Sequence, residues 1–120
     1  MGRKIDLRTA LAEDPHPLTA PPAWRNGVLA RIPGESVVHA GEGRLDGAWH
    51  SQDGAELLVV VEGELVVEFE TGPFRAGPGE AILIAAGERH RASVPDYCLL
   101  VSVEPVGMKR TEVADCEPPY

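Results

Sequence analysis

Glycine and proline interrupt this chain so often that long helices have little room to form. The 120 residues include 13 Gly and 11 Pro, and short runs rich in Val, Leu and Ile lie between them. Proline lacks the N–H that a helix interior needs, and glycine lowers helix propensity, so these runs favour β-strands joined by turns. The pattern therefore predicts an all-β sandwich or barrel.

Seven segments are expected to form strands. Glu64–Glu70 alternates clearly, because Leu65, Val67 and Phe69 share one face and acidic residues share much of the other. Leu57–Val61 is apolar on both faces, which is typical of a strand buried between two layers. The predicted strands are Ser36–Ala40, Arg44–Ser51, Glu56–Glu62, Glu64–Glu70, Glu80–Ala85, His90–Val94 and Tyr97–Val103.

The two ends of the chain differ from this central region. Residues 5–13 predict a short helix that Asp6 can cap, and the prolines at 15–22 then favour an extended arm. The polar stretch after Lys109 predicts a loose tail. We expect a single domain made of an N-terminal arm at 1–35, a barrel at 36–106 and a C-terminal tail at 107–120.

Charge and hydropathy exclude several classes of partner. The chain has 19 acidic and 11 basic residues, a net charge of −8, and no Lys/Arg cluster that could displace counterions from phosphates. We therefore expect no nucleic-acid partner and no membrane partner. The longest apolar run is far shorter than the ~20 residues that cross a bilayer. Two cysteines, Cys98 and Cys116, and the lack of an apolar secretory signal predict a reducing, cytoplasmic setting.

Four side chains that can bind a metal ion recur at a spacing suited to β-strands. His50 and Gln52 lie two residues apart, so on a strand both side chains point to the same side. The short turn Asp53–Ala55 can bring Glu56 back on a following strand, and His90 comes from a later one. The spacing therefore allows a shared site but does not show how His90 reaches it.

This arrangement resembles the first motif of the cupin family. That motif is His-x-His, three or four residues, Glu, six residues and Gly. In this chain it corresponds to His50, Gln52, Glu56 and Gly63, with Gln52 in place of the second histidine. An amide oxygen binds a metal less strongly than an imidazole nitrogen, so this departure bears on the chemistry.

The second cupin motif follows in the expected order. It reads Gly, five residues, Pro-x-Gly, two residues and His, and it corresponds here to Gly79, Ala85, Gly87 and His90, with Ala85 in place of the proline. The resemblance covers roughly residues 36–104. It implies a small single-domain cupin, whose fold is a double-stranded β-helix or jelly-roll barrel.

The resemblance also implies a mononuclear metal site and an enzyme of cupin type. The metal ligands would be His50, Gln52, Glu56 and His90, and Glu56 or Gln52 could also move a proton. Two imidazoles and a carboxylate suit a divalent ion such as Fe, Zn, Mn or Ni. The expected enzyme acts on a small organic molecule as an oxygenase, isomerase, decarboxylase or cyclase. The alternative is a non-catalytic small-molecule binding or sensing cupin, with or without a metal.

Simpler interpretations of the same residues stay open. Glu56 begins an apolar strand, where an unpaired carboxylate is costly, so either a metal or a salt bridge to Arg89 or Arg91 would compensate its charge. Gln52 is a weak ligand, a donor to a ligand, or a bystander. His16 and His39 are expected to be ordinary core or surface residues.

The pocket and the assembly complete the expectations. Leu58, Val60, Ile82 and Ile84 are predicted to face the interior and to wall a ligand pocket. We expect a homodimer, to which the proline-rich arm and the apolar strand Tyr97–Val103 would contribute, because pairing covers exposed strand edges.

Overall fold

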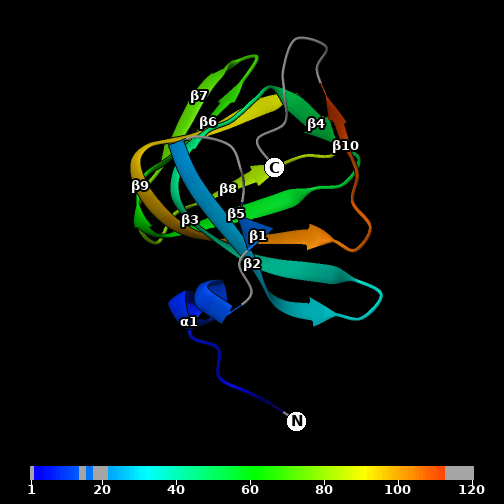
Figure 1. Cartoon of the computed structure of the whole chain (residues 1–120). Helices are drawn as coiled ribbons and strands as arrows, with labels where there is room; N and C mark the ends of the chain where they lie inside the picture. Colours follow the sequence, from blue (N-terminus) through cyan, green and yellow to red (C-terminus); the bar gives the residue numbers. More distant parts are fainter. Residues whose placement is uncertain (1, 14–15, 18–21, 113–120) are drawn as a thin grey trace.

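The computed structural model describes residues 2–13, 16–17 and 22–112. Most of these residues lie in β-strands that curl into a jelly-roll barrel, so the predicted fold class is confirmed (Figure 1). No described helix is long and apolar enough to cross a membrane. The elements are α1 (Leu7–Glu13), β1 (His16–Pro17), β2 (Pro22–Ile32), β3 (Ser36–Asp46), β4 (His50–Gln52), β5 (Glu56–Gly63), β6 (Leu65–Phe69), β7 (Gly72–Ala76), β8 (Ala81–Ile84), β9 (His90–Pro105) and β10 (Arg110–Glu112).

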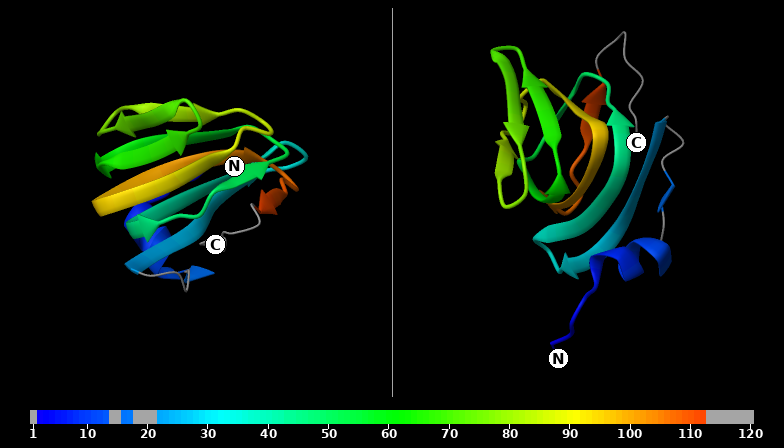
Figure 2. Two further views of the ribbon diagram at one scale, coloured as in Figure 1. Left: turned by 90° about the horizontal axis from the view of Figure 1, so that it is seen from above. Right: turned by 90° about the vertical axis from the view of Figure 1, so that its left-hand side faces the viewer.

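The long strand β9 connects the two layers of the barrel. Its first part pairs with β6, its second part pairs with β5, and β3 runs beside both parts. The strands curve around a common interior, as the two views in Figure 2 show. We predicted two separate strands, His90–Val94 and Tyr97–Val103. The structure has one, because the chain continues through Pro95 with its pairing transferred from one layer to the other.

Helix α1 covers part of the outer face of the sheet. Its predicted cap is confirmed, since the backbone N–H of Thr9 donates to Asp6 Oδ1 at 3.0 Å. Leu11 is fully buried against Leu29, Ala40 and Leu99 on the strands below. Arg8 on the same helix also pairs with Glu62 at 2.7 Å, so both apolar and polar contacts hold the helix against the strands.

Several elements differ from the sequence predictions. Residues 22–32 were placed in the arm, but they form β2, which pairs with β3 from Pro22 opposite Leu45 to Ile32 opposite Ser36. The predicted strand Arg44–Ser51 is interrupted at residues 47–49. Strand β7 was missed because its side chains are mostly exposed and it contains a proline.

The start of the predicted tail forms β10, whose residues pair with β4. Asp53 holds the chain there on two sides, because its N–H donates to Lys109 O at 3.0 Å and its Oδ1 accepts from Lys109 N at 2.8 Å. Polar contacts of this kind produce no hydrophobic pattern, so nothing in the sequence indicated β10. Cys116 and the rest of residues 113–120 lie outside the described residues, as does the side chain of His16.

The barrel interior is filled mainly by aliphatic side chains, together with Phe69 and the indole of Trp24. Leu58, Val60, Ile82 and Ile84 are all buried in this core, as predicted. The indole of Trp24 on β2 lies over Gly41 on β3, so closely that a Cβ atom at position 41 would collide with Trp24 Cζ2. Glycine at this position is therefore what allows the indole to lie flat inside the barrel.

Replacing Gly41 by alanine should destabilise the fold. The added methyl group would displace Trp24 and also lie 3.1 Å from Asn26 Oδ1, and overpacking of this kind costs about 1–3 kcal/mol. Urea unfolding measures the loss. Gly77→Ala is the matched control, because its nearest contact is an ordinary 3.6 Å to Glu80 Oε1. Equal stability of the two variants would contradict this packing.

Candidate metal and ligand site

Two buried histidines lie side by side where β4 and β9 begin. His50 and His90 are the one residue pair that joins these two strands, and the side chains of opposed residues extend from the same face of a sheet. Their ring centroids are 4.3 Å apart, with an angle of 58° between the planes. Each residue is 1% exposed. The sequence could not show how His90 comes close to His50. The pairing of β4 with β9 brings the two residues together.

Backbone carbonyls fix the orientation of both rings. His50 Nδ1 lies 2.9 Å from Ala48 O, and His90 Nδ1 lies 2.8 Å from Glu88 O. A neutral imidazole can only donate a proton to a carbonyl, so each Nδ1 carries the hydrogen and each Nε2 carries a lone pair. Metal-binding histidines are commonly oriented by such a bond.

Burial keeps both rings neutral at physiological pH. It lowers the pKa of His50 to about 4; the hydrogen bond to Ala48 O opposes this effect, and the positive charge of Arg110 adds to it. Burial also lowers the pKa of His90, against a smaller opposing effect of the carbonyl of Glu88. Neutral imidazoles are the form that binds metal ions.

Gln52 and Glu56 form a second buried pair. Gln52 Nε2 donates to Glu56 Oε1 at 3.2 Å. Gln52 Oε1 is buried and accepts no hydrogen bond from any described residue, which leaves an amide oxygen available in the interior. Burial raises the pKa of Glu56, while the hydrogen bond from Gln52 opposes the rise and the nearby carboxylate of Glu104 adds to it.

These two pairs decide how well the predicted ligand set fits a metal ion. Within the described part of the chain, no three His, Cys, Asp or Glu side chains come close enough together to hold one. His50 and His90 come together, whereas Glu56 is hydrogen-bonded to Gln52. The two imidazole Nε2 atoms and the buried amide oxygen of Gln52 are of donor types that bind a cation, and the Glu56 carboxylate is hydrogen-bonded to that amide.

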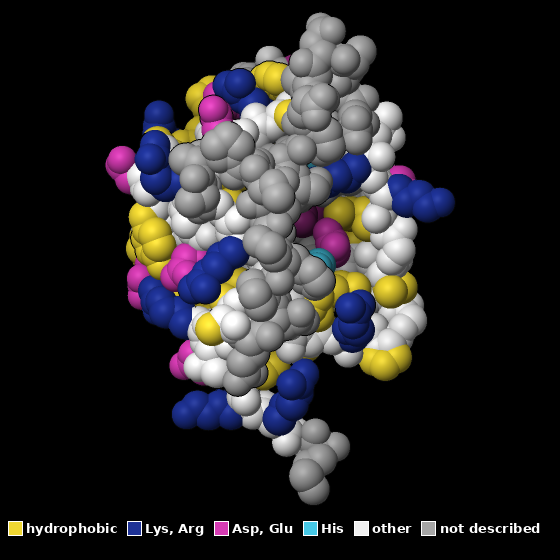
Figure 3. Space-filling model, viewed as in Figure 1, with side chains coloured by type: hydrophobic (Ala, Val, Ile, Leu, Met, Phe, Trp, Pro, Cys, Tyr) yellow, Lys and Arg dark blue, Asp and Glu magenta, His cyan; other side chains and the backbone are white. Residues whose placement is uncertain are grey.

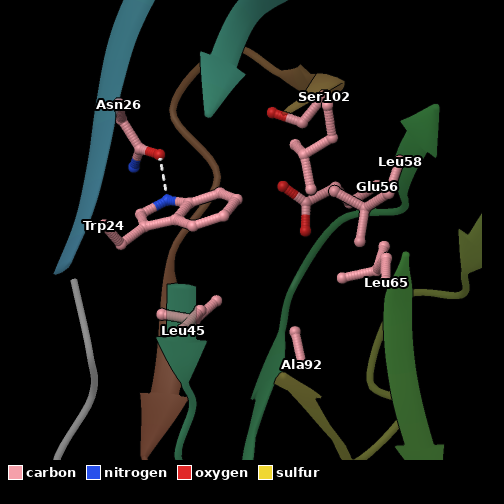
Figure 4. A pocket seen from close by; sticks show the side chains of 9 residues that line it. Trp24, Asn26, Leu45, Glu56, Leu58, Leu65, Ala92 and Ser102 are labelled. Carbon is pink, nitrogen blue, oxygen red and sulfur yellow. Dashed lines mark hydrogen bonds between the residues drawn. The ribbon is translucent and has the colours of Figure 1, made fainter. Parts of the chain in front are cut away.

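A cavity of about 50 Å³ that is partly open to solvent adjoins this site through Glu56. Figure 4 shows the Glu56 carboxylate and the Ser102 hydroxyl on one side of it, with the Trp24 indole opposite. The indole N–H donates to Asn26 Oδ1 at 2.6 Å. The cavity is lined by Trp24, Asn26, Leu45, Glu56, Leu58, Leu65, Ala92, Leu100 and Ser102. Of the four residues predicted to wall the pocket, only Leu58 lines it.

The salt bridge considered for Glu56 is not formed. Arg91 pairs with Glu68 at 2.8 Å, and Arg89 lies 3.6 Å from Glu70. Both guanidinium groups also lie over the ring of Trp49, at 4.7 Å for Arg89 and 5.6 Å for Arg91. Trp49, just before β4, therefore packs under two arginines.

Sequence reasoning missed two charged residues near the site. Glu104 lies two residues beyond Ser102 on β9 and 3.7 Å from His39, and this same-face spacing was a signal that could have found it. Arg110 on β10 is opposite Gln52 and influences the pKa values of His50, Glu56, His90 and Glu104, but nothing in its polar surroundings indicated this. Acidic and histidine side chains gather in a hollow on this face of the molecule (Figure 3).

Comparison with known proteins agrees with this geometry. The family model for the cupin domain matches residues 36–104, which is more than half of the chain. The chain belongs to the cupin family. No curated protein matches it.

Solved structures share the cupin fold at low sequence identity. The polyketide cyclase RemF from Streptomyces resistomycificus has a TM-score of 0.74 and 21% identity, over 100% of this chain and 91% of that one. A cupin-2 domain protein from Shewanella frigidimarina has a TM-score of 0.63 and 23% identity, over 67% and 78%. A structure of DMSP lyases has a TM-score of 0.63 and 20% identity, over 75% and 52%. At these identities the likeness concerns the fold alone.

Acid should weaken this cupin through His50. Its folded pKa of about 4 lies below the ordinary 6.5, so the unfolded chain binds the proton more readily. The neutral ring therefore contributes its full share to the stability of the folded protein above pH 6.5, and this contribution is lost as the pH falls toward 4. Between about pH 7.5 and about pH 5, this effect lowers the free energy of unfolding by about 2 kcal/mol.

Urea unfolding of the wild type and of His50→Gln isolates this effect. The raised pKa of Glu56 changes the pH dependence of stability in the opposite direction, but it does so in both proteins and cancels in the comparison. The wild type should lose about 2 kcal/mol more than the variant over that pH range. The same loss in both would show that His50 is not held neutral.

Proposed function

We propose that this cupin is a metal-dependent enzyme that acts on a small organic molecule inside the barrel. The main support is the pair of buried, neutral histidines, whose Nδ1 atoms are both bonded to backbone carbonyls. A buried polar pair held in this way has little structural value by itself, since apolar residues would fill the same space without a desolvation cost. Its orientation suits ligation through Nε2.

His50, His90 and Gln52 would hold the ion. Their donors are nitrogen and oxygen atoms, which suits Fe, Zn, Mn or Ni. When bound, such an ion supplies Lewis acidity, which polarises a carbonyl or acidifies water. Gln52 has a double role in this proposal, since its oxygen is available to the ion and its nitrogen donates to Glu56.

Glu56 would transfer the proton. Its side chain lines the cavity and contacts Gln52, so it lies between the proposed ligands and the space where a substrate would bind. Its raised pKa lies closer to neutrality than that of an ordinary carboxyl group, which suits a general acid or base. The indole of Trp24 and the aliphatic wall would exclude water from the reacting group.

Some structural relatives are enzymes, namely the polyketide cyclase and the DMSP lyases. Their reactions belong to those proteins, and the low identity does not choose a reaction for this chain. The likeness does support the idea that a barrel of this kind can carry catalysis.

A non-catalytic binding cupin is the second candidate. It is favoured by one observation, the absence of a third His, Cys, Asp or Glu beside the histidine pair in the described residues. In that case the cavity would bind its ligand without an ion, and removing the histidines would leave ligand binding unchanged.

We further propose that two copies of the chain pair. Leu57 on β5 lies opposite both Leu83 on β8 and Val103 on β9, so the three form one apolar row on the outer face of the sheet. Leu83 is 65% exposed. Apolar rows that face water are typical of protein interfaces, and this supports a homodimer formed through this face.

Removing either histidine should remove the metal. Protein purified without added metal should contain close to one ion per chain, and His50→Ala or His90→Ala should each lose most of it, because each deletes a strong ligand. Elemental analysis by mass spectrometry measures this. His39→Ala is the matched control and should keep its metal. Wild-type protein that is free of metal after growth in metal-replete medium would contradict the proposal.

Two further variants separate the roles of Gln52 and Glu56. Gln52→His should bind the ion about tenfold more tightly or better, since an imidazole nitrogen replaces an amide oxygen. Glu56→Gln should keep the metal, because the proposal assigns this residue to proton transfer. If Glu56→Gln loses as much metal as His90→Ala, then Glu56 is a ligand and its assigned role is wrong.

A further inference from the structure

Trp24 occupies space that would otherwise belong to the cavity. It is 4% exposed, lies on β2 outside the matched cupin domain, and forms one wall of the cavity. Two contacts hold it there: its N–H donates to Asn26 Oδ1 at 2.6 Å, and its ring lies against Gly41. The indole therefore cannot turn aside without breaking a hydrogen bond and losing a close packing contact.

The remaining space is small. A cavity of about 50 Å³ can hold a few water molecules, whereas one of about 150 Å³ is needed to enclose benzene. A pocket of this size does not enclose an aromatic ring, and it encloses only a group of a few non-hydrogen atoms.

The side chains that line the cavity also affect which charge a ligand can carry. Glu56 is the single ionisable side chain among the described lining residues, and Asn26 and Ser102 are the neutral polar ones. No lysine, arginine or histidine of the described residues lines the cavity, so an anion in it would face the carboxyl group of Glu56 without direct contact with a cationic side chain.

We infer that Trp24 sets the size limit of this site and that the substrate group entering the cavity is small, uncharged and hydrogen-bonding, an inference that rests on the proposed function. Ser102 and Glu56 bind this group, and Trp24 excludes larger ones. Trp24 is thus a specificity-determining residue contributed by a strand that precedes the cupin motifs.

Protein NMR titrations with four probes test the inference. Acetamide is small and neutral, acetate is its charged counterpart, and phenol and indole are larger. In the wild type, acetamide should shift the signals of Leu58 and Ser102, and acetate should bind at least about tenfold more weakly. Phenol and indole should leave both signals unchanged.

The Trp24→Ala variant should then bind indole in the vacated space, with an affinity at least about tenfold above that of the wild type. Trp49→Ala is the matched control, because it removes the other indole, which lies under Arg89 and does not line the cavity, and it should behave as the wild type. Trp24→Phe serves if the alanine variant does not fold, and it should admit phenol.

Three outcomes would overturn the inference. These are no shift of Leu58 and Ser102 with acetamide, equal binding of acetate and acetamide, and wild-type binding of indole that shifts Leu58 as strongly as in Trp24→Ala. The metal content of the same samples tests the proposed function separately. Protein without metal that still binds acetamide and excludes indole would contradict the metal-dependent function and leave the size limit in place.

Discussion

The pairing of His50 with His90 is the contact on which the candidate site depends. Strands β4 and β9 meet at this one pair, so the register of the barrel places two imidazoles 4.3 Å apart in a region without access to water. Burying two imidazoles is costly unless each N–H is satisfied, and the carbonyls of Ala48 and Glu88 do this. Those bonds also direct both Nε2 lone pairs away from the backbone. The fold and the chemistry of the site therefore share one cause, the strand register that brings the two histidines together.

Much of the barrel could be predicted because its information is local. The alternation in Leu65–Phe69 and the apolar run in β5 define strands by themselves. The motif glycines Gly63 and Gly87 both have positive φ, at 77°, a conformation that glycine adopts readily. The two motifs also placed His50, Gln52, Glu56 and His90 correctly inside the barrel, where all four are buried. Motif spacing was informative here because it reflects which strand positions face inward.

Other features could not be predicted because they depend on contacts between distant segments. Glu56 turns toward Gln52 instead of joining the histidines, and no local pattern determines that choice. Arg110 reaches the site only because Asp53 fixes the start of β10, a polar contact without a hydrophobic signal. Trp24 was an isolated aromatic residue in the sequence, and its place inside the barrel depends on Gly41 across the strand pair.

The central claim is that the two Nε2 atoms share a cation. A crystal structure of protein purified without added metal, with diffraction collected on both sides of the absorption edges of Fe, Mn, Ni and Zn, tests it most directly. We expect an anomalous peak about 2.0–2.3 Å from the Nε2 atoms of both His50 and His90. Rings that hold their orientation with no anomalous peak near either nitrogen would contradict it and would leave a barrel that binds its ligand without a metal.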